Sequence, residues 1–413
     1  MSQAGTNWAG NVAFSAAAVA APTTVDEVAS LVASAERVRV VGSRHSFSDI
    51  ADTDGTLLSL AALEGGPELD SARGVVRVPG GLRYGDLAPW LHDRGRALAN
   101  LASLPHISIA GAVATGTHGS GERIGSLATQ VSAMELIDGE GELVRVERGD
   151  PDFDGSVVSL GSLGVVTALE LDTEPAFEMA QTVFEGARWD DVLARFDDVQ
   201  RSGDSVSLFT TWRDADAVDQ IWMKTRGAAP DLSTLGARLA DGPRHPLPGI
   251  DAEPCTPQLG VRGPWFDRLP HFRLAFTPSA GEELQSEYLV PRHDARAAIE
   301  AVRGLSSRIA PLVLVCEVRT VAADDLWLSP AFGTDVVGIH FTWVRDQSAV
   351  MALLPEIEAA LPPSARPHWG KLFALAGDAV AARYPRWDDV VALRARRDPH
   401  RRFANAWTAR LGV

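Results

Sequence analysis

Residues 42–48 read Gly42-Ser43-Arg44-His45-Ser46-Phe47-Ser48, and they follow a short apolar strand that the pattern predicts at 38–41. A second run of small residues stands further along the chain, Gly111-Ala112-Val113-Ala114-Thr115-Gly116-Thr117-His118-Gly119-Ser120-Gly121. Small side chains leave the backbone open, so the N–H groups of two such loops can closely approach the pyrophosphate of a dinucleotide. The sequence therefore predicts a dinucleotide site, with the imidazole of His45 beside the bound molecule.

Length and charge restrict the classes of protein to which the chain can belong. At 413 residues it exceeds one typical hydrophobic core, so two domains are expected. Hydrophobic residues make up 46% and charged residues 22%, values typical of a globular enzyme. The net charge of −16 comes without a dense basic stretch, which argues against nucleic acid and against an anionic membrane as partners. We expect neither partner, and we expect a monomer.

Three features favour a cytoplasmic location. No apolar run reaches the length needed to span a bilayer. The alanine-rich stretch at 11–21 resembles a signal peptide only slightly, because no Lys or Arg precedes Arg37. The two cysteines, Cys255 and Cys316, are too few for a disulfide framework and lack metal-ligand spacing.

Short strands mixed with a few helices predict an α+β fold. Thr24 followed by Glu27 is typical of a capping box before a helix at 25–35. Further elements are expected as strands at 74–79 and 165–171, a helix carrying Leu87, Trp90 and Leu91, and a hairpin of 131–137 with 143–146. The pattern changes near residue 173, where strand-like segments at 206–212 and 219–225 precede a Pro/Gly-rich loop at 242–264. It changes again at Pro362-Pro363.

Two expected strands, at 315–321 and 338–343, carry polar residues at alternate positions. Side chains alternate between the faces of a strand, so Glu317 and Arg319 share one face, and His340 and Thr342 share one face. If the strands pair, a carboxylate, a guanidinium, an imidazole and a hydroxyl gather on one surface. That set suits a polyhydroxylated ligand, whose hydroxyls need both donors and acceptors. The alternative is a solvated sheet face with an ordinary surface ion pair.

Arginine replaces lysine almost everywhere in the chain. Only two of the 38 basic residues are lysines, Lys224 and Lys371. A lysine is usually a surface residue, but its retention at 371 suggests that a compact point charge is needed there. Among the histidines, His118 is interpreted as a hydrogen-bonding loop residue, and the others show no spacing typical of a metal site, so no metal is expected.

Taken together, these residues resemble the vanillyl-alcohol oxidase superfamily of flavoproteins and, within it, the alditol oxidases. The resemblance covers essentially the whole chain. Its markers, in chain order, are Arg44-His45-Ser46-Phe47-Ser48-Asp49, Leu101-Ala102-Ser103-Leu104-Pro105-His106-Ile107-Ser108, Thr115-Gly116-Thr117-His118-Gly119, Glu317-Val318-Arg319 and His368-Trp369-Gly370-Lys371.

The resemblance implies a two-domain FAD-binding fold with a mixed-sheet substrate domain. It implies an FAD domain at 1–173, a substrate domain at 174–362, and a segment at 363–413 that returns to the FAD domain. It also implies a covalent bond from His45 to the 8α-methyl of the flavin. The residues expected to bind FAD are Val41, Gly42, Ser43, Arg44, His45, Ser46, Ala102, Ser103, Ser108, Gly111, Ala112, Val113, Ala114, Thr115, Thr117, His118, Val165, Val166 and His368.

The family also implies an activity, the oxidation of the terminal alcohol of xylitol or sorbitol to the aldose while O2 becomes H2O2. By resemblance, the polyol is contacted by Ser103, Glu317, Arg319, His340, Thr342 and Lys371, with Lys371, Glu317, Arg319 and His340 as the catalytic set. Either Lys371 or Glu317 could take the hydroxyl proton. Ala102 beside the flavin leaves the reactivity with O2 open. Sugar-1,4-lactone oxidases or dehydrogenases share much of the pattern, and a non-catalytic carbohydrate-binding protein is a remote alternative.

Overall fold

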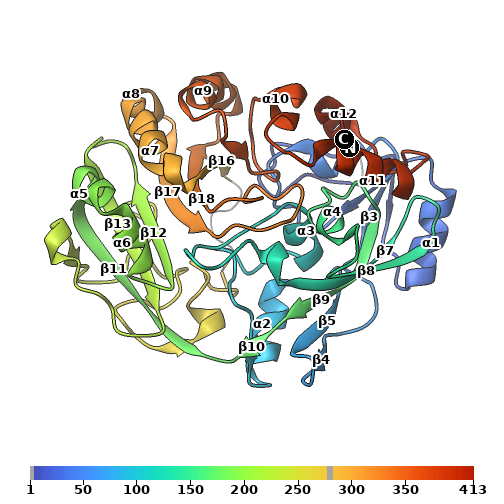
Figure 1. The fold of residues 1–413 in the computed structure, drawn as a ribbon, viewed down its shortest axis with the longest axis horizontal. Helices are drawn as coiled ribbons and strands as arrows, with labels where there is room; N and C mark the ends of the chain where they lie inside the picture. Colours follow the sequence, from blue (N-terminus) through green and yellow to red (C-terminus); the bar gives the residue numbers. More distant parts are fainter. Residues whose placement is uncertain (1–3, 277–281) are drawn as a thin grey trace.

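The computed structural model describes residues 4–276 and 282–413, and it confirms the α+β fold class. The nine-stranded sheet lies in one half of the molecule, and the three-stranded and five-stranded sheets lie in the other half (Figure 1). The C-terminal helices lie above the half that contains the N-terminal strands. Across the described ranges, no helix combines the length and apolar character needed to cross a membrane.

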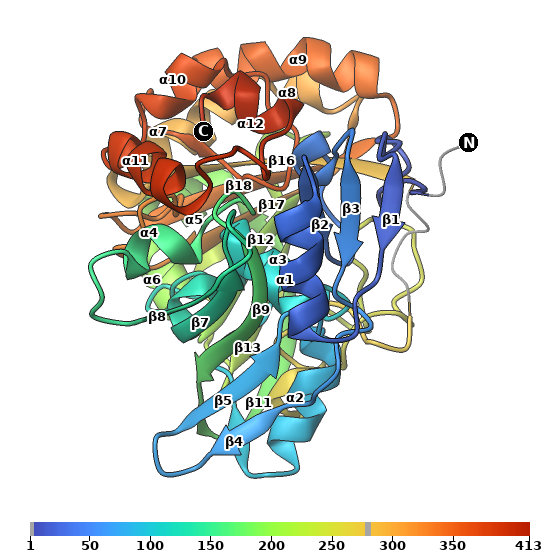
Figure 2. The same ribbon diagram turned by 90° about the vertical axis from the view of Figure 1, so that its right-hand side faces the viewer.

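The first glycine-rich loop begins where strand β2 of a small parallel sheet ends. This sheet has the order β1-β3-β2. Its strands are β1 (Ala18–Ala20), β2 (Val38–Val41) and β3 (Thr56–Ser59), and α1 (Val25–Ser34) precedes β2 (Figure 2). The Thr24 side chain caps α1 by accepting the Glu27 N–H, as predicted. The Glu27 carboxylate instead accepts the N–H of Thr23 at 2.7 Å, so the reciprocal half of the capping box is displaced by one residue.

A five-stranded antiparallel sheet of order β4-β5-β9-β7-β8 completes the N-terminal half. Its strands are β4 (Glu68–Asp70), β5 (Val75–Pro79), β7 (Val131–Ile137), β8 (Leu143–Glu147) and β9 (Val165–Asp172). The predicted hairpin is therefore the β7–β8 pair. The helices of this half are α2 (Tyr84–His92), α3 (Ile109–Ala114) and α4 (Phe153–Val157). Short β6 (Arg96–Ala97) pairs with β10 (Glu174–Pro175).

The larger sheet has the order β14-β11-β13-β12-β17-β18-β16-β19, with β15 paired to β11. Its strands are β11 (Glu178–Arg188), β12 (Ser205–Thr210), β13 (Ala217–Thr225), β14 (Arg238–Leu239), β15 (Gly263–Pro264), β16 (Glu283–Pro291), β17 (Val313–Val321), β18 (Val336–Val344) and β19 (Arg366–Pro367). The accompanying helices are α5 (Trp189–Ala194), α6 (Phe196–Arg201), α7 (Ala295–Gly304), α8 (Ser306–Ile309) and α9 (Gln347–Ala360).

Alternation along these strands separates an apolar face from a polar face. Val318, Ile339 and Phe341 are fully buried and pack with side chains of α7 and α9 in one hydrophobic cluster. The side chains at the intervening positions therefore point to the opposite face. This opposite face carries the polar residues that the sequence placed together.

The last segment of the chain returns to the N-terminal half through α10 (Gly377–Ala381), α11 (Trp387–Arg397) and α12 (Ala406–Leu411). Asn405 donates to the carbonyl oxygens of Ile50 and Asp52, and the Val38 N–H donates to Arg402 O. Trp369 stacks on Tyr384 with ring centroids 4.9 Å apart. These contacts hold residues 368–371 between the two halves.

Candidate functional site

A cavity enclosing about 1560 Å³, including its open mouth, lies between the N-terminal loops and the large sheet. We call residues 41–48 and 102–118 the loop wall, and the polar side chains Gln285, Glu287, Glu317, Arg319, His340 and Thr342 of β16, β17 and β18 the sheet wall. Lys371 and His368 reach the same cavity from the C-terminal segment. The structure thus brings together every catalytic and substrate residue that the sequence suggested, from three separate parts of the chain.

The loop wall is close-packed around one serine. A Cβ atom at Gly42 would collide with Ser108 Oγ, and one at Gly111 would lie 2.8 Å from the same oxygen. Ser43 and Ser108 also bond each other reciprocally, since the Ser108 N–H donates to Ser43 Oγ at 3.2 Å and Ser108 Oγ faces the Ser43 N–H. The two glycines therefore allow the two loops to meet, which joins the two predicted motifs into one surface.

His45 lies at this junction with a free nitrogen. Its ring stacks on Trp8 with centroids 5.3 Å apart, and Nδ1 is buried without a hydrogen-bond partner. Burial lowers the pKa of His45 to about 4, so the imidazole is neutral at physiological pH. A neutral, unpartnered ring nitrogen on a cavity wall is available to bind or bond to an occupant.

A second cavity, enclosing about 990 Å³, continues behind the loop wall. The two cavities share wall residues that include Gly42, Ser43, Ser108 and Gly111, and Ala114 and Val166 line only the second cavity. Together they make an elongated space with small-residue walls, which fits FAD. Val113 and Val165 line neither cavity, because their side chains pack in the hydrophobic clusters. All other predicted FAD residues lie on a cavity wall.

Strand pairing assembles the sheet wall. In the β17–β18 register, Glu317 lies opposite His340 and Val315 opposite Thr342, and in the β16–β18 register Glu287 lies on the other side of His340. The four polar residues that the sequence placed on one face therefore do share it, namely Glu317, Arg319, His340 and Thr342. They are buried rather than solvated, which rules out an ordinary surface ion pair as the explanation for this face.

Glu287 forms the centre of the sheet wall. Its Oε1 lies 2.7 Å from Arg319 Nη2 and 3.2 Å from His118 Nε2, and its Oε2 lies 2.9 Å from Lys371 Nζ. Gly338 leaves room for the carboxylate, since a Cβ there would lie 3.0 Å from Oε1. Glu287 is 1% exposed and was not identified from the sequence.

Burial and pairing fix the charges of this network. Burial alone would raise the pKa of Glu287, but Lys371 and Arg319 outweigh it and hold that pKa well below the usual range. The same balance, with Arg319 and His271 as the opposing groups, lowers the pKa of Glu317. Burial lowers the pKa of Lys371, and the contact with Glu287 opposes part of that shift. Both carboxylates are therefore ionised, and the ammonium is the group nearest to losing its proton.

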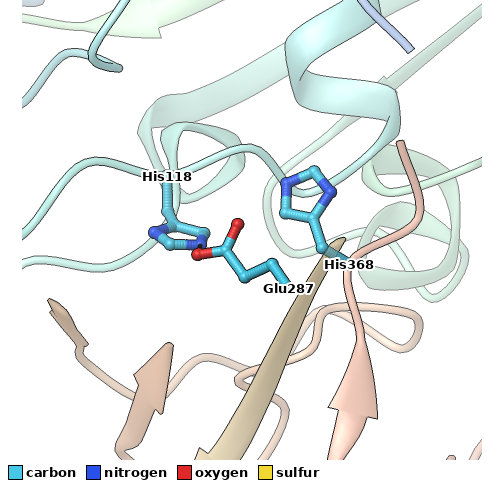
Figure 3. Close-up of side chains that lie close together, drawn as sticks. All are labelled: His118, Glu287 and His368. Atoms are coloured by element: carbon cyan, nitrogen blue, oxygen red, sulfur yellow. Dashed lines mark ion pairs between the residues drawn. The ribbon is translucent and has the colours of Figure 1, made fainter. Parts of the chain in front are cut away.

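His118, Glu287 and His368 place three possible ligand atoms within 4.8 Å of one another, with the carboxylate between the two rings (Figure 3). The geometry does not favour a metal ion. Arg319 and Lys371 already pair with the carboxylate, so a cation there would be repelled by two positive charges. The His368 Nδ1 accepts the Gly370 N–H at 3.1 Å, which puts the proton of the neutral ring on Nε2.

The remaining polar groups of the cavity are partly engaged. His340 Nε2 lies 3.1 Å from Gln285 Oε1, while its Nδ1 is buried without a partner. Burial lowers the pKa of His340 well below its usual value, so this ring is neutral. On the loop wall, the Ser103 carbonyl accepts the N–H of His271 at 3.1 Å. This bond ties the loop wall to the segment of His271 and Phe272, which also lines the cavity.

Three residues of the site were not predicted from the sequence, namely Gln285, Glu287 and His271. The first two carried a partial signal, because Glu283, Gln285 and Glu287 occupy alternate positions, although Ser286 interrupts the apolar residues between them. His271 carried none. It lies in an irregular segment, and only the tertiary fold brings its Nε2 to 2.8 Å from Glu317 Oε1.

Comparisons with known proteins agree with this site. Residues 16–147 match the family described as FAD binding domain, and residues 281–411 match the family described as D-arabinono-1,4-lactone oxidase. The chain is 49% identical to an alditol oxidase from a Streptomyces species, over 98% of both chains. It is 30% identical to an L-gulono-1,4-lactone dehydrogenase from Mycobacterium tuberculosis, over 100% of this chain and 99% of that protein.

Among solved structures, a cholesterol oxidase from B. sterolicum superposes with a TM-score of 0.76 at 18% identity. The match covers 100% of this chain and 97% of that chain. At this identity the likeness concerns the fold alone.

Proposed function

Since the chain belongs to the FAD-dependent oxidoreductase family that includes the alditol oxidases, we propose that it oxidises the terminal primary alcohol of an alditol such as xylitol or sorbitol to the aldose. Electrons then pass to O2, which becomes H2O2. The observation that carries the proposal is the buried network of Glu287, Arg319, Lys371 and Glu317, which faces His45 across one cavity.

A polyol matches the chemistry of the sheet wall. Each hydroxyl is both a donor and an acceptor, and the wall offers ionised carboxylates as acceptors and a guanidinium as a donor. In this proposal Arg319, Thr342, His340 and Ser103 hold the hydroxyls next to the reacting carbon. Such multiple contacts fix the orientation of the substrate, which is the main contribution of protein groups to this reaction.

The cofactor supplies hydride acceptance from carbon and electron transfer to O2 when it is bound. The protein must remove the hydroxyl proton as the hydride leaves. Glu317 is a weak base because Arg319 and His271 hold its pKa well below its usual value. Lys371 is the better candidate, since burial lowers its pKa. We assign proton removal to the neutral amine form of Lys371, which becomes an ammonium in the step, and orientation of the same hydroxyl to Glu317.

We further propose that His45 bonds covalently to the 8α-methyl of FAD. The support is its neutral ring and its buried, unpartnered Nδ1 on the wall of the first cavity, next in sequence to Ser46, which lines both cavities. The loop backbone and small side chains of both cavities would hold the rest of FAD. The divisions at 173 and 362, the monomeric state and the cytoplasmic location stay predictions of the same proposal.

A second candidate activity is the oxidation of a sugar-1,4-lactone. It is favoured by the match of residues 281–411 to the D-arabinono-1,4-lactone oxidase family and by the similarity to a lactone dehydrogenase. The higher identity to an alditol oxidase over the whole chain favours the alditol.

Anaerobic mixing of the holoenzyme with xylitol, sorbitol, glycerol and L-gulono-1,4-lactone separates the two activities. We expect xylitol and sorbitol to bleach the flavin absorbance and the lactone to leave it unchanged. Bleaching by the lactone alone would contradict the proposal and support the second candidate. Consumption of O2 in an oxygen electrode then distinguishes an oxidase from an enzyme that needs an artificial acceptor.

A further inference from the structure

Lys224, one of the only two lysines in the chain, is buried on the same face of the large sheet as Glu317. It lies on β13, is 0% exposed, and has no carboxylate within 4 Å among the described residues. Its Nζ contacts the Leu269 carbonyl, the Pro270 carbonyl at 3.2 Å and His271 Nδ1 at 3.0 Å. A buried cation without an anionic partner is costly, so these contacts call for an explanation.

His271 connects this lysine to the cavity. Its Nδ1 faces Lys224, and its Nε2 lies 2.8 Å from Glu317 Oε1. Trp222 and Phe209 surround the ring edge-on, with centroids 5.2 and 5.7 Å away, and both are buried. The chain Lys224–His271–Glu317 therefore runs through an apolar environment, where hydrogen bonds are stronger and misplaced protons costlier than in water.

The donors and acceptors of Lys224, His271 and Glu317 determine where the protons between these residues lie. Glu317 is a carboxylate, which can only accept, so His271 Nε2 must carry a proton. An ammonium has three protons, and Lys224 has three acceptors when His271 Nδ1 is unprotonated. Burial lowers the pKa of Lys224 to about 7 and that of His271 to about 4, which places the shared proton on the lysine.

We propose that Lys224 and His271 are positioning residues. Lys224 donates to His271 Nδ1 and so supports the Nε2–H tautomer that Glu317 requires. His271 then holds Glu317 by Oε1 and leaves Oε2 on the side of Arg319. The proposal rests on the proposed function, because the task of Glu317 in it is to orient the reacting hydroxyl. Lys224 does not line the cavity, and His271, which does, acts on the reacting hydroxyl through Glu317.

The tautomer is tested first, by NMR of the holoenzyme with ¹⁵N-labelled histidine. His271→Gln identifies the signals of His271 by their disappearance. We expect an unprotonated Nδ1 and a protonated Nε2, and we expect the Nδ1 signal to shift in Lys224→Met because Nδ1 loses its donor. A protonated Nδ1 in the unmodified enzyme, or a spectrum unchanged by Lys224→Met, would overturn the proposal.

The second test is the limiting rate of flavin reduction by xylitol under anaerobic conditions. Lys224→Met and His271→Leu should each lower this rate by about 10-fold or more. His271→Gln should recover most of the loss, because its amide offers one acceptor for Lys224 and one donor for Glu317. Equal rates for Gln and Leu at position 271 would contradict the proposal.

Arg268→Met is the matched control for a loosened segment. Arg268 is also a buried cation, and it donates to the carbonyls of Val261 and Asp267 in the segment next to Leu269. It should leave the reduction rate within about two-fold, since its loss breaks no bond to Glu317. A loss as large as that of Lys224→Met would assign both residues a merely structural role. If no polyol bleaches the unmodified enzyme, the proposed function fails, while the NMR result still decides the tautomer.

Discussion

The loop wall and the sheet wall of the cavity are built from different materials. The loop wall consists largely of small side chains and backbone, and the side chain of its one arginine, Arg44, turns away to donate to the carbonyls of Ala4 and Thr6. The sheet wall concentrates two carboxylates, a guanidinium and the neutral imidazole of His340 on three neighbouring strands. A large cofactor can be held by shape and many backbone groups, whereas a small polyol needs a few strong, directed contacts.

The two walls also differ in the residues that their structures require. Close approach of the two loops requires glycine at positions 42 and 111. The sheet wall requires buried charges to be balanced, and Glu287 meets this need by pairing with both Arg319 and Lys371. Substitutions on the two walls should therefore have different effects. Those on the loop wall should reduce flavin attachment, and those on the sheet wall should reduce the catalytic rate.

Lys371→Met should have the largest effect. It removes the proposed proton acceptor and keeps the length of the side chain, so reduction of the flavin by xylitol should slow about 10³-fold while FAD stays bound. Stopped-flow absorbance measures the rate, and the visible spectrum gives the flavin content. A near-normal rate would remove Lys371 from the reaction.

Glu287→Gln should have the next largest effect and lower the maximal rate of flavin reduction by xylitol about 10²-fold. It should also move the pH profile. Glu287 stabilises the ammonium of Lys371, so its loss lowers the pKa of Lys371 further, and the base becomes deprotonated at lower pH. The rising limb of the reduction rate should therefore shift to lower pH. A shift to higher pH would contradict proton removal by Lys371.

The same variant removes the carboxylate that pairs with two buried cations, of which Arg319 keeps Glu317 at 3.6 Å. We expect a loss of about 3 kcal/mol in the free energy of unfolding. Thermal melting at constant ionic strength checks this, and Glu135→Gln, which disrupts a partly exposed network with Arg77 and Arg145, serves as the control with a small expected change.

His45→Ala tests the loop wall. The variant should bind FAD without a covalent bond, so acid precipitation releases the yellow colour into the supernatant, and reduction should slow about 10-fold because the flavin is less well oriented. Mass spectrometry of the unmodified protein should place FAD on the peptide that contains His45. Flavin on another peptide, or on none, would disprove the bond.

Ser103→Ala should have the smallest effect. One hydroxyl contact to the polyol is lost, worth about 1 kcal/mol, so reduction at limiting xylitol should fall about five-fold. The backbone carbonyl that holds His271 is unaffected by the change. A loss of flavin from this variant would indicate that the serine serves the cofactor instead.

The sequence predicted the loop wall better than the sheet wall, for a physical reason. The loop wall is built from contiguous stretches in which small residues and a histidine can be read as a pattern. Glu317 and His340 were placed on one face correctly, because strand alternation is a local rule that holds whenever two strands pair. Glu287 was missed because its role depends on three partners that are distant in sequence, Arg319, Lys371 and His118.

The helices and strands were predictable to within a few residues, since capping and periodicity are local signals. The helix expected at 25–35 ends at Ser34, and the strand expected at 206–212 ends at Thr210, before Trp212 adopts a positive φ of 57°. The order of the large sheet was not predictable, because its pairings join strands far apart in the chain. Lys224 shows the same limit, since only that sheet order places it on the same face as Glu317.

A crystal of the holoenzyme soaked with xylitol under anaerobic conditions tests the central claim most directly. The account predicts flavin density joined to the ring of His45 on the loop wall. It also predicts xylitol on the sheet wall, with its terminal hydroxyl within hydrogen-bond distance of Lys371 Nζ and Glu317. Flavin density detached from His45, or xylitol bound away from Glu317, Arg319 and Lys371, would contradict it.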